Sequence, residues 1–164
     1  MNKSQYQFFK LIKAPFKFNL FLLTKLPAAF FSGVRVRKID EERCTTSVPY
    51  KWLTQNPFHS AYFASLAMAA EMSTGTLALS NIYKSPAKVS MLLTAMQATY
   101  FKKAISRTYF TCNKGKEITK IIEESIRTGE GKSIVAKSIG KNEKGELIAE
   151  FLFTWSFKMK NVSK

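Results

Sequence analysis

The stretch "NPFHSAYFASLAMAAEMSTG", residues 56–75, decides the fold of this chain. From Ala61 to about Leu79 the residue types favour a helix that only Gly75 interrupts, and Ser60 is the expected N-cap. The side chains are apolar on nearly every side, and a helix of that kind is buried. The frequent alanines allow a neighbouring element to approach closely. We therefore expect one long helix wrapped by a sheet.

Glu71 is the only formal charge between Lys51 and Lys84. Burying a lone carboxylate is costly unless it is paired or solvated, and burial raises its pKa. These properties suit a general base near neutral pH, although a place near a helix end or on a wet seam is the structural alternative. His59, the single histidine, lies before the helix without a Ser, Cys or Asp partner at a diagnostic spacing. We interpret it as a polar loop residue.

Helix geometry limits how such a site is assembled. Phe63 lies in the first turn, where backbone N–H groups lack helical partners and face an anion. Glu71 follows eight residues later, about 12 Å along the helix axis. One helix cannot bring both groups to one substrate carbonyl, but two antiparallel copies in a two-fold dimer can. An active site on this helix is therefore expected to be shared across a dimer interface.

The flanking sequence predicts an antiparallel sheet. The run 88–101 is long and mostly apolar, which is typical of a central strand. A helix is expected at 115–129, with isoleucines at helical spacing and Gly129 as its C-terminal cap. The order of elements is typical of an α+β domain. Strands are predicted at residues 34–39, 44–52, 88–101, 105–112, 132–140 and 146–158.

The N-terminal segment, residues 1–32, is aromatic and basic. Two short amphipathic helices, broken at Pro15 and Pro27, are expected, and the longest apolar run is far too short to span a bilayer. Such helices either pack on the domain or lie on a membrane surface. We favour packing, with peripheral membrane contact through residues 1–31 as the alternative. The expected organisation is therefore an N-terminal helical addition, 1–32, and one α+β domain, 33–164.

Composition adds a strong positive charge. The chain of 164 residues has 26 Lys and Arg against 11 Asp and Glu, a net charge of +15. Such a field attracts nucleic acid, anionic lipid or a small phosphorylated ligand, although solubility alone also explains it. Nucleic acid is not expected, because no recognised binding motif accompanies the charge. Cys44 and Cys112 match no metal or redox spacing, so we expect reduced core or strand residues in a cytoplasmic protein without a metal or cofactor.

A family resemblance rests on Asn56, on Glu71 fifteen residues later, and on strands that surround an apolar helix. In these features residues 33–159 resemble the hotdog fold, and within it the PaaI-type acyl-CoA thioesterases. Their motif runs Asn, a short loop, His-Gly-Gly and then an acidic residue on the helix. Here Tyr62-Phe63-Ala64 stands at the His-Gly-Gly position. With "VRVRKIDEERCTTSVPYKWLTQNPF" and "FTWSFK", the whole chain resembles a bacterial hotdog subfamily of unknown function.

The resemblance implies a role for each matched residue. Glu71 is expected to act as general base on water or as nucleophile at a thioester carbonyl. The backbone N–H of Phe63 is expected to bind the oxyanion, and Asn56 to orient the water or the carbonyl. Tyr62 takes the position of the motif histidine, which helps to hold the thioester. The expected substrate-binding residues are Tyr62, Ala64, Met68 and Thr94.

The expected function is hydrolysis of an acyl-CoA or acyl-carrier thioester by a homodimer or a dimer of dimers. The coenzyme A thioester is the substrate, and no cofactor is needed. A non-catalytic protein that binds acyl-CoA or fatty acyl chains is the alternative, because Phe63 and Ala64 replace glycines that permit close backbone approach. A hotdog dehydratase fits less well, since its usual pairing of a histidine with an acid is missing.

Overall fold

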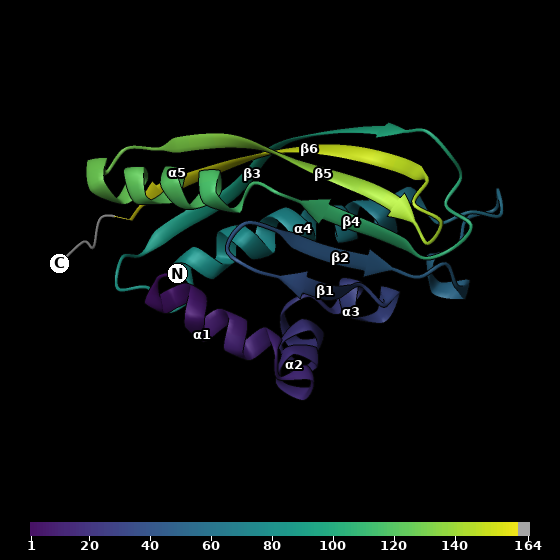
Figure 1. The fold of residues 1–164 in the computed structure, drawn as a ribbon, viewed down its shortest axis with the longest axis horizontal. Helices are drawn as coiled ribbons and strands as arrows, with labels where there is room; N and C mark the ends of the chain where they lie inside the picture. Colours follow the sequence, from purple (N-terminus) through teal and green to yellow (C-terminus); the bar gives the residue numbers. More distant parts are fainter. Residues whose placement is uncertain (161–164) are drawn as a thin grey trace.

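The computed structural model describes residues 1–160, which form a six-stranded antiparallel sheet around the long helix α4 (Phe63–Ile82) (Figure 1). The strand order is β1-β2-β4-β5-β6-β3. This arrangement confirms the expected α+β class and the hotdog architecture. The strands are β1 (Arg35–Ile39), β2 (Cys44–Val48), β3 (Val89–Tyr100), β4 (Thr108–Cys112), β5 (Lys132–Asn142) and β6 (Leu147–Met159).

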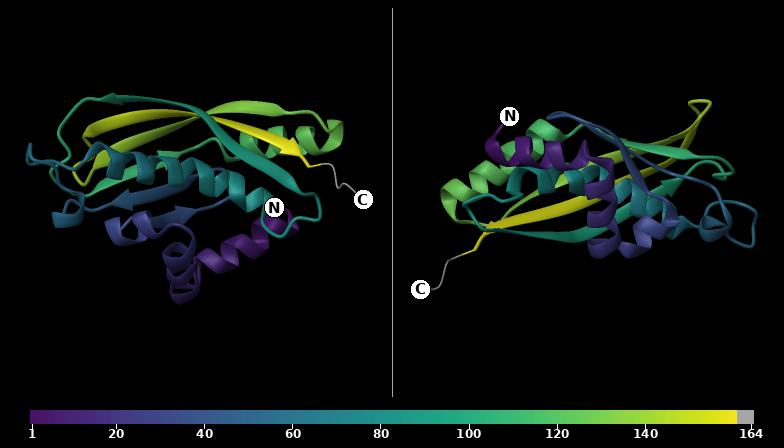
Figure 2. Two further views of the ribbon diagram at one scale, coloured as in Figure 1. Left: turned by 180° about the vertical axis from the view of Figure 1, so that it is seen from behind. Right: turned by 90° about the horizontal axis from the view of Figure 1, so that it is seen from below.

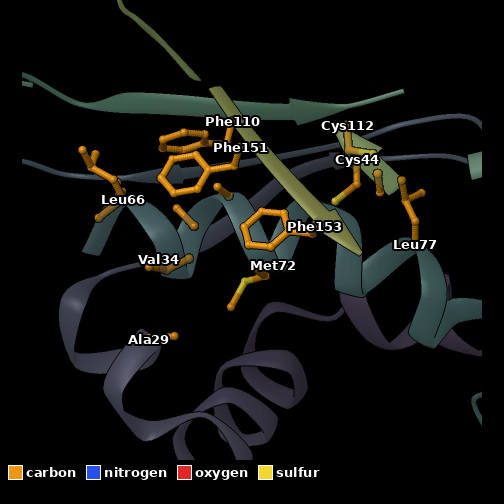
Figure 3. Close-up of a cluster of buried hydrophobic side chains, with 14 of the residues drawn as sticks. Ala29, Val34, Cys44, Leu66, Met72, Leu77, Phe110, Cys112, Phe151 and Phe153 are labelled. Atoms are coloured by element: carbon orange, nitrogen blue, oxygen red, sulfur yellow. The ribbon is translucent and has the colours of Figure 1, made fainter. Parts of the chain in front are cut away.

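Buried side chains of β6 belong to the core in which α4 packs. Phe151 and Phe153 (Figure 3) have no exposed surface, and neither has Phe157, as the alternating pattern of this strand predicts. Buried hydrogen bonds hold the helix in place. The indole N–H of Trp155 donates to Thr74 Oγ1 at 2.9 Å, and the hydroxyl of Thr46 donates to the carbonyl oxygen of Ala69 at 2.6 Å. The helix is therefore fixed in both position and rotation.

The strand β3 lies at an edge of the sheet, so the expectation that it is central is wrong. It pairs with β6 on one side and with no other strand of residues 1–160. Several apolar side chains on it stay exposed, including Leu92 at 62% and Met96 at 50%. Its apolar composition therefore does not reflect burial within this protomer. A long edge with exposed apolar side chains is a surface on which another strand can pair.

Three N-terminal helices, rather than two, precede the sheet: α1 (Lys3–Ile12), α2 (Pro15–Lys25) and α3 (Pro27–Ser32). Pro15 and Pro27 each occupy the first turn of a helix, where a missing N–H removes no helical bond. The helices lie on the side of α4 away from β5 and β6 (Figure 2). Phe8, Phe18 and Leu22 are buried there. The N-terminal segment thus packs on the domain.

The remaining elements follow the sequence patterns closely. α5 (Gly115–Thr128) ends at Gly129, whose left-handed φ of 74° confirms the predicted cap. β2 ends at Val48, before Pro49 and short of the predicted end of the strand at Trp52, and residues Trp52–Thr54 form a short 3-10 helix, η1. Within residues 1–160, no helix combines the length and apolar character needed to cross a membrane.

The two cysteines lie where the sequence predicts, in strands and in the core. Cys44 on β2 and Cys112 on β4 are register partners, and both are buried and free. Burial raises the pKa of both thiols, so they stay protonated at neutral pH. They therefore act as small apolar core residues. No cluster of three potential metal ligands occurs among residues 1–160.

Candidate active site

Asn56 organises the loop that leads into α4. Its Oδ1 accepts hydrogen bonds from the N–H of Phe58 at 3.0 Å and from both the N–H and the hydroxyl of Ser60, each at 3.2 Å. Its Nδ2 donates to the carbonyl oxygen of Ala61 at 3.4 Å. His59 adopts a left-handed φ of 57° in the middle of this loop. The amide of Asn56 is thus engaged with backbone and side chain groups of its own loop.

The helix begins at Phe63, later than the expected N-cap at Ser60. The N–H of Ala61 donates to the carbonyl oxygen of Ala104 at 2.8 Å, and the N–H of Tyr62 donates to the carbonyl oxygen of Thr54 at 2.7 Å. These contacts hold the chain extended up to Tyr62, which is the N-cap and has no side-chain capping bond. Long-range hydrogen bonds therefore set the start of the helix, and they override the local preference of Ser60.

An open cavity of about 580 Å³ lies at this end of α4. We call it the amino-end cavity; residues 56–58, 60–63, Leu66 and 100–104 line it. Phe63 is 52% exposed, and its ring packs edge-on against the ring of Tyr62 with 4.8 Å between centroids. Within residues 1–160, the backbone N–H of Phe63 has no hydrogen-bond acceptor. The first turn thus offers this donor beside an open cavity.

Glu71 lies in a second, smaller space of about 140 Å³. Apolar side chains of α1, α2, α4 and β3 surround its carboxyl group, and no hydrogen bond or ion pair within residues 1–160 reaches that group. Burial raises the pKa of Glu71 to about 7. We call this space the Glu71 pocket. Its lining residues are Phe8, Phe18, Phe21, Leu22, Leu26, Glu71, Met72, Gly75, Thr76, Leu79 and Met91.

Gly75 leaves the room that the Glu71 carboxyl occupies. A Cβ atom at position 75 would lie 2.6 Å from Oε1 of Glu71 and 3.3 Å from Cζ2 of Trp155. Glycine inside a helix is unfavourable by about 1 kcal/mol relative to alanine. The sequence marks Gly75 only as a possible helix breaker. In the folded protein it lets the carboxyl and β6 approach the same turn of α4.

The predicted site residues fall into two groups in one protomer. Asn56, Tyr62 and Phe63 border the amino-end cavity, and Glu71 borders its own pocket two turns further along α4. The remaining predicted substrate-binding residues, Ala64, Met68 and Thr94, line neither space.

Met68 is partly buried on the same strip of α4 as Ala64 and Glu71. Thr94 is exposed at an irregularity of β3, where its hydroxyl donates to the carbonyl oxygen of Thr154 at 3.1 Å. Sequence reasoning missed the walls that the N-terminal helices give to the Glu71 pocket. The spacing of Phe18 and Leu22, four apart on one helix face, is the signal that could have revealed them.

Comparison with known proteins identifies the family and supports the fold. A family model described as a domain of unknown function, DUF4442, matches residues 17–156. No protein with a curated description matches the chain.

Solved structures give close matches in shape but not in sequence. A Pseudomonas aeruginosa protein described as of unknown function and a "Probable Thioesterase" has a TM-score of 0.73 at 19% identity, over 89% of this chain and 97% of that one. A protein of unknown function from Chlorobaculum tepidum has a TM-score of 0.74 at 16% identity, over 89% and 97% of the two chains. A thioesterase from Haemophilus influenzae has a TM-score of 0.61 at 12% identity, over 87% and 89%. These likenesses establish a shared fold.

Proposed function

Because the chain belongs to the DUF4442 family and has the hotdog fold, we propose that it is a thioester hydrolase whose active site is shared by two copies. One observation carries the proposal. A carboxyl group with a pKa of about 7 and a backbone N–H, both without a partner among residues 1–160, lie on the same helix two turns apart. A base that is half-ionised near neutral pH and an oxyanion donor are the two groups that hydrolysis of a thioester needs.

A homodimer completes the site in this proposal. Two α4 helices that pack antiparallel bring Glu71 of one copy near the first turn of the other, which offsets the separation of about 12 Å along one helix. The free edge of β3 supports this arrangement. Leu92, Met96 and Tyr100 are each at least 46% exposed along it. Pairing of two such edges would extend the sheet and cover these side chains.

The chemistry requires few groups. Glu71, as carboxylate, accepts a proton from a water molecule while the water oxygen bonds to the thioester carbonyl carbon. The N–H of Phe63 of the second copy donates to the oxyanion that forms. The intermediate then collapses, the C–S bond breaks, and the carboxyl of Glu71 returns its proton to the departing thiolate. We propose Asn56 as a positioning residue, because its amide already holds the loop that presents this N–H.

The two spaces suggest how a substrate divides between them. The Glu71 pocket is apolar and close in volume to an engineered cavity of roughly 150 Å³ that binds benzene, so it accommodates an acyl end of about six carbons. The amino-end cavity opens to solvent beside Lys103, which makes no ion pair within residues 1–160. A positive rim suits the phosphates of coenzyme A or of a carrier. The two free thiols fit a reducing compartment, the cytoplasm.

The test is release of free thiol from a panel of acyl-CoA and acyl-pantetheine substrates. We expect Glu71→Gln to lower the rate by about 10²- to 10⁴-fold, the range for loss of a positioned base. Glu123→Gln is the matched control, because Glu123 is exposed and forms no ion pair within the described chain. A Glu71→Gln enzyme as fast as the parent would exclude this mechanism.

A second function has its own supporting observation. Tyr62 and Phe63 place two aromatic rings beside the first turn of α4, where a hydrolase of the resembled type has a histidine followed by a glycine. Such rings beside the site are easier to reconcile with a protein that binds acyl-CoA but does not hydrolyse it. The same panel separates the two functions, because binding alone raises Tm without releasing thiol.

A further inference from the structure

The helix α2 is apolar on two opposite faces, and the protein covers only one of them. Phe18 and Leu22 point inward and are 7% and 1% exposed. Phe16, Leu20 and Leu23 follow one another at spacings of four and three, so they form one stripe on the other face. Their exposed fractions are 82%, 52% and 39%. We call these three residues the α2 stripe.

The surroundings of the α2 stripe are basic. Lys13, Lys17 and Lys25 are all exposed on or beside the same helix. Residues 1–39 contain eight Lys and Arg and no acidic residue. Figure 1 shows α2 at the bottom of the molecule, on the far side from β5 and β6, so the helix projects from the body of the protein. An apolar stripe with lysines beside it, on a projecting helix, supplies two contacts that hold a helix in a membrane interface: apolar burial and attraction to anionic lipid.

Charge also distinguishes a lipid surface from a second copy of this chain. A two-fold contact through the α2 stripe would bring the lysines beside the stripe on one copy close to those on the other, which is repulsive. An anionic bilayer instead attracts these lysines while its interface takes up the apolar side chains. The observations therefore favour lipid as the occupant of this face.

We propose that α2 docks the protein on the surface of a bilayer that contains anionic lipid. The α2 stripe inserts into the boundary between headgroups and acyl chains, and the lysines contact lipid phosphates. Leu26, at the end of α2, is 44% exposed and also lines the Glu71 pocket. The docked face thus adjoins that pocket. This proposal does not depend on thioester hydrolysis.

The test is flotation of the full chain with vesicles of phosphatidylglycerol and phosphatidylcholine, and with vesicles of phosphatidylcholine alone. We expect binding to the anionic vesicles that weakens as salt is raised. The variant Phe16→Ser/Leu20→Ser/Leu23→Ser should bind at least about tenfold more weakly, because three anchors are lost. It should keep the parent Tm, since the replaced side chains are exposed.

Two control variants make the test specific. Val135→Ser removes an exposed apolar side chain from β5, on the opposite side of the molecule, and should bind like the parent. Lys13→Glu/Lys17→Glu should weaken binding more than Lys141→Glu/Lys144→Glu, which changes one lysine at the end of β5 and one in the β5–β6 turn. The proposal is overturned if the parent does not float with anionic vesicles, or if the triple serine variant floats equally well. It is also overturned if that variant instead loses a self-association that the parent shows without lipid.

Discussion

The two spaces along α4 differ in size, polarity and access to water. The amino-end cavity is about 580 Å³, opens to solvent, and has a hydrogen-bonded loop at its border. The Glu71 pocket is about 140 Å³, and its walls are almost wholly apolar. The first space offers a donor for an anion, and the second raises the pKa of a carboxyl group. Neither space alone contains both groups that the proposed reaction needs.

The largest expected effect at the amino-end cavity comes from Phe63→Pro. Proline removes the N–H at the first helical position, where it costs no helical bond, and Tyr62 already has a ψ of 134° that suits a following proline. We expect the rate of thiol release to fall by about 10²- to 10³-fold, as for loss of one oxyanion donor. Tm should change little.

Phe63→Ala is the matched control for that variant. It removes the ring but keeps the N–H, so it should retain most of the activity. If the alanine and proline variants lose equal activity, the ring and not the backbone donor is what matters at this position.

The Glu71 pocket should make stability depend on pH. Burial raises the pKa of Glu71 from 4.5 to about 7, so the folded protein holds this proton more tightly than the unfolded chain. The stabilisation is complete below about pH 4.5 and is lost as pH rises to about 7. The contribution is on the order of 3 kcal/mol.

The measurement is the difference in unfolding free energy between the parent and Glu71→Gln, from denaturant titrations at several pH values. That difference should change in favour of the glutamine variant as pH rises from 5 to 8. A constant difference across this range would show that the carboxyl group is solvated in the folded protein.

Gly75→Ala tests the fit of the same pocket and should have the smallest effect. The added methyl group displaces the Glu71 carboxyl, whose Oε1 would be 2.6 Å away. We expect about a tenfold lower rate, because the base moves from its position. The better helix propensity of alanine offsets the crowding, so the unfolding free energy should change by no more than about 1 kcal/mol. Thr76→Ala, one residue further and also in the pocket lining, is a control for mutation of this turn.

Much of the fold follows from local patterns in the sequence. The alternation in β6, the isoleucine spacing in α5 and the prolines that open α2 and α3 each act within a few residues, so sequence alone predicts them. The prediction that β3 is a central strand is wrong for a physical reason. Apolar side chains indicate burial, but they do not say whether the cover comes from the same chain or from another one.

The candidate site was predicted only in part, because its geometry depends on distant segments. Glu71 is conspicuous as a lone charge in an apolar helix, and its raised pKa follows from that setting. The start of α4 depends on hydrogen bonds to Thr54 and Ala104, which no local rule predicts. The walls of the Glu71 pocket include Phe8 and Phe18, more than fifty residues earlier in the chain. Sequence spacing could not assign them to the site.

The most direct test of the shared site combines two inactive variants in one dimer. A heterodimer with Glu71→Gln in one copy and Phe63→Pro in the other, purified through two different tags, has one site with both groups intact and one site with neither. We predict that it regains about half of the parent rate, because each site draws its two groups from different copies. A heterodimer as inactive as the Glu71→Gln and Phe63→Pro homodimers would contradict the account and place both groups in one chain.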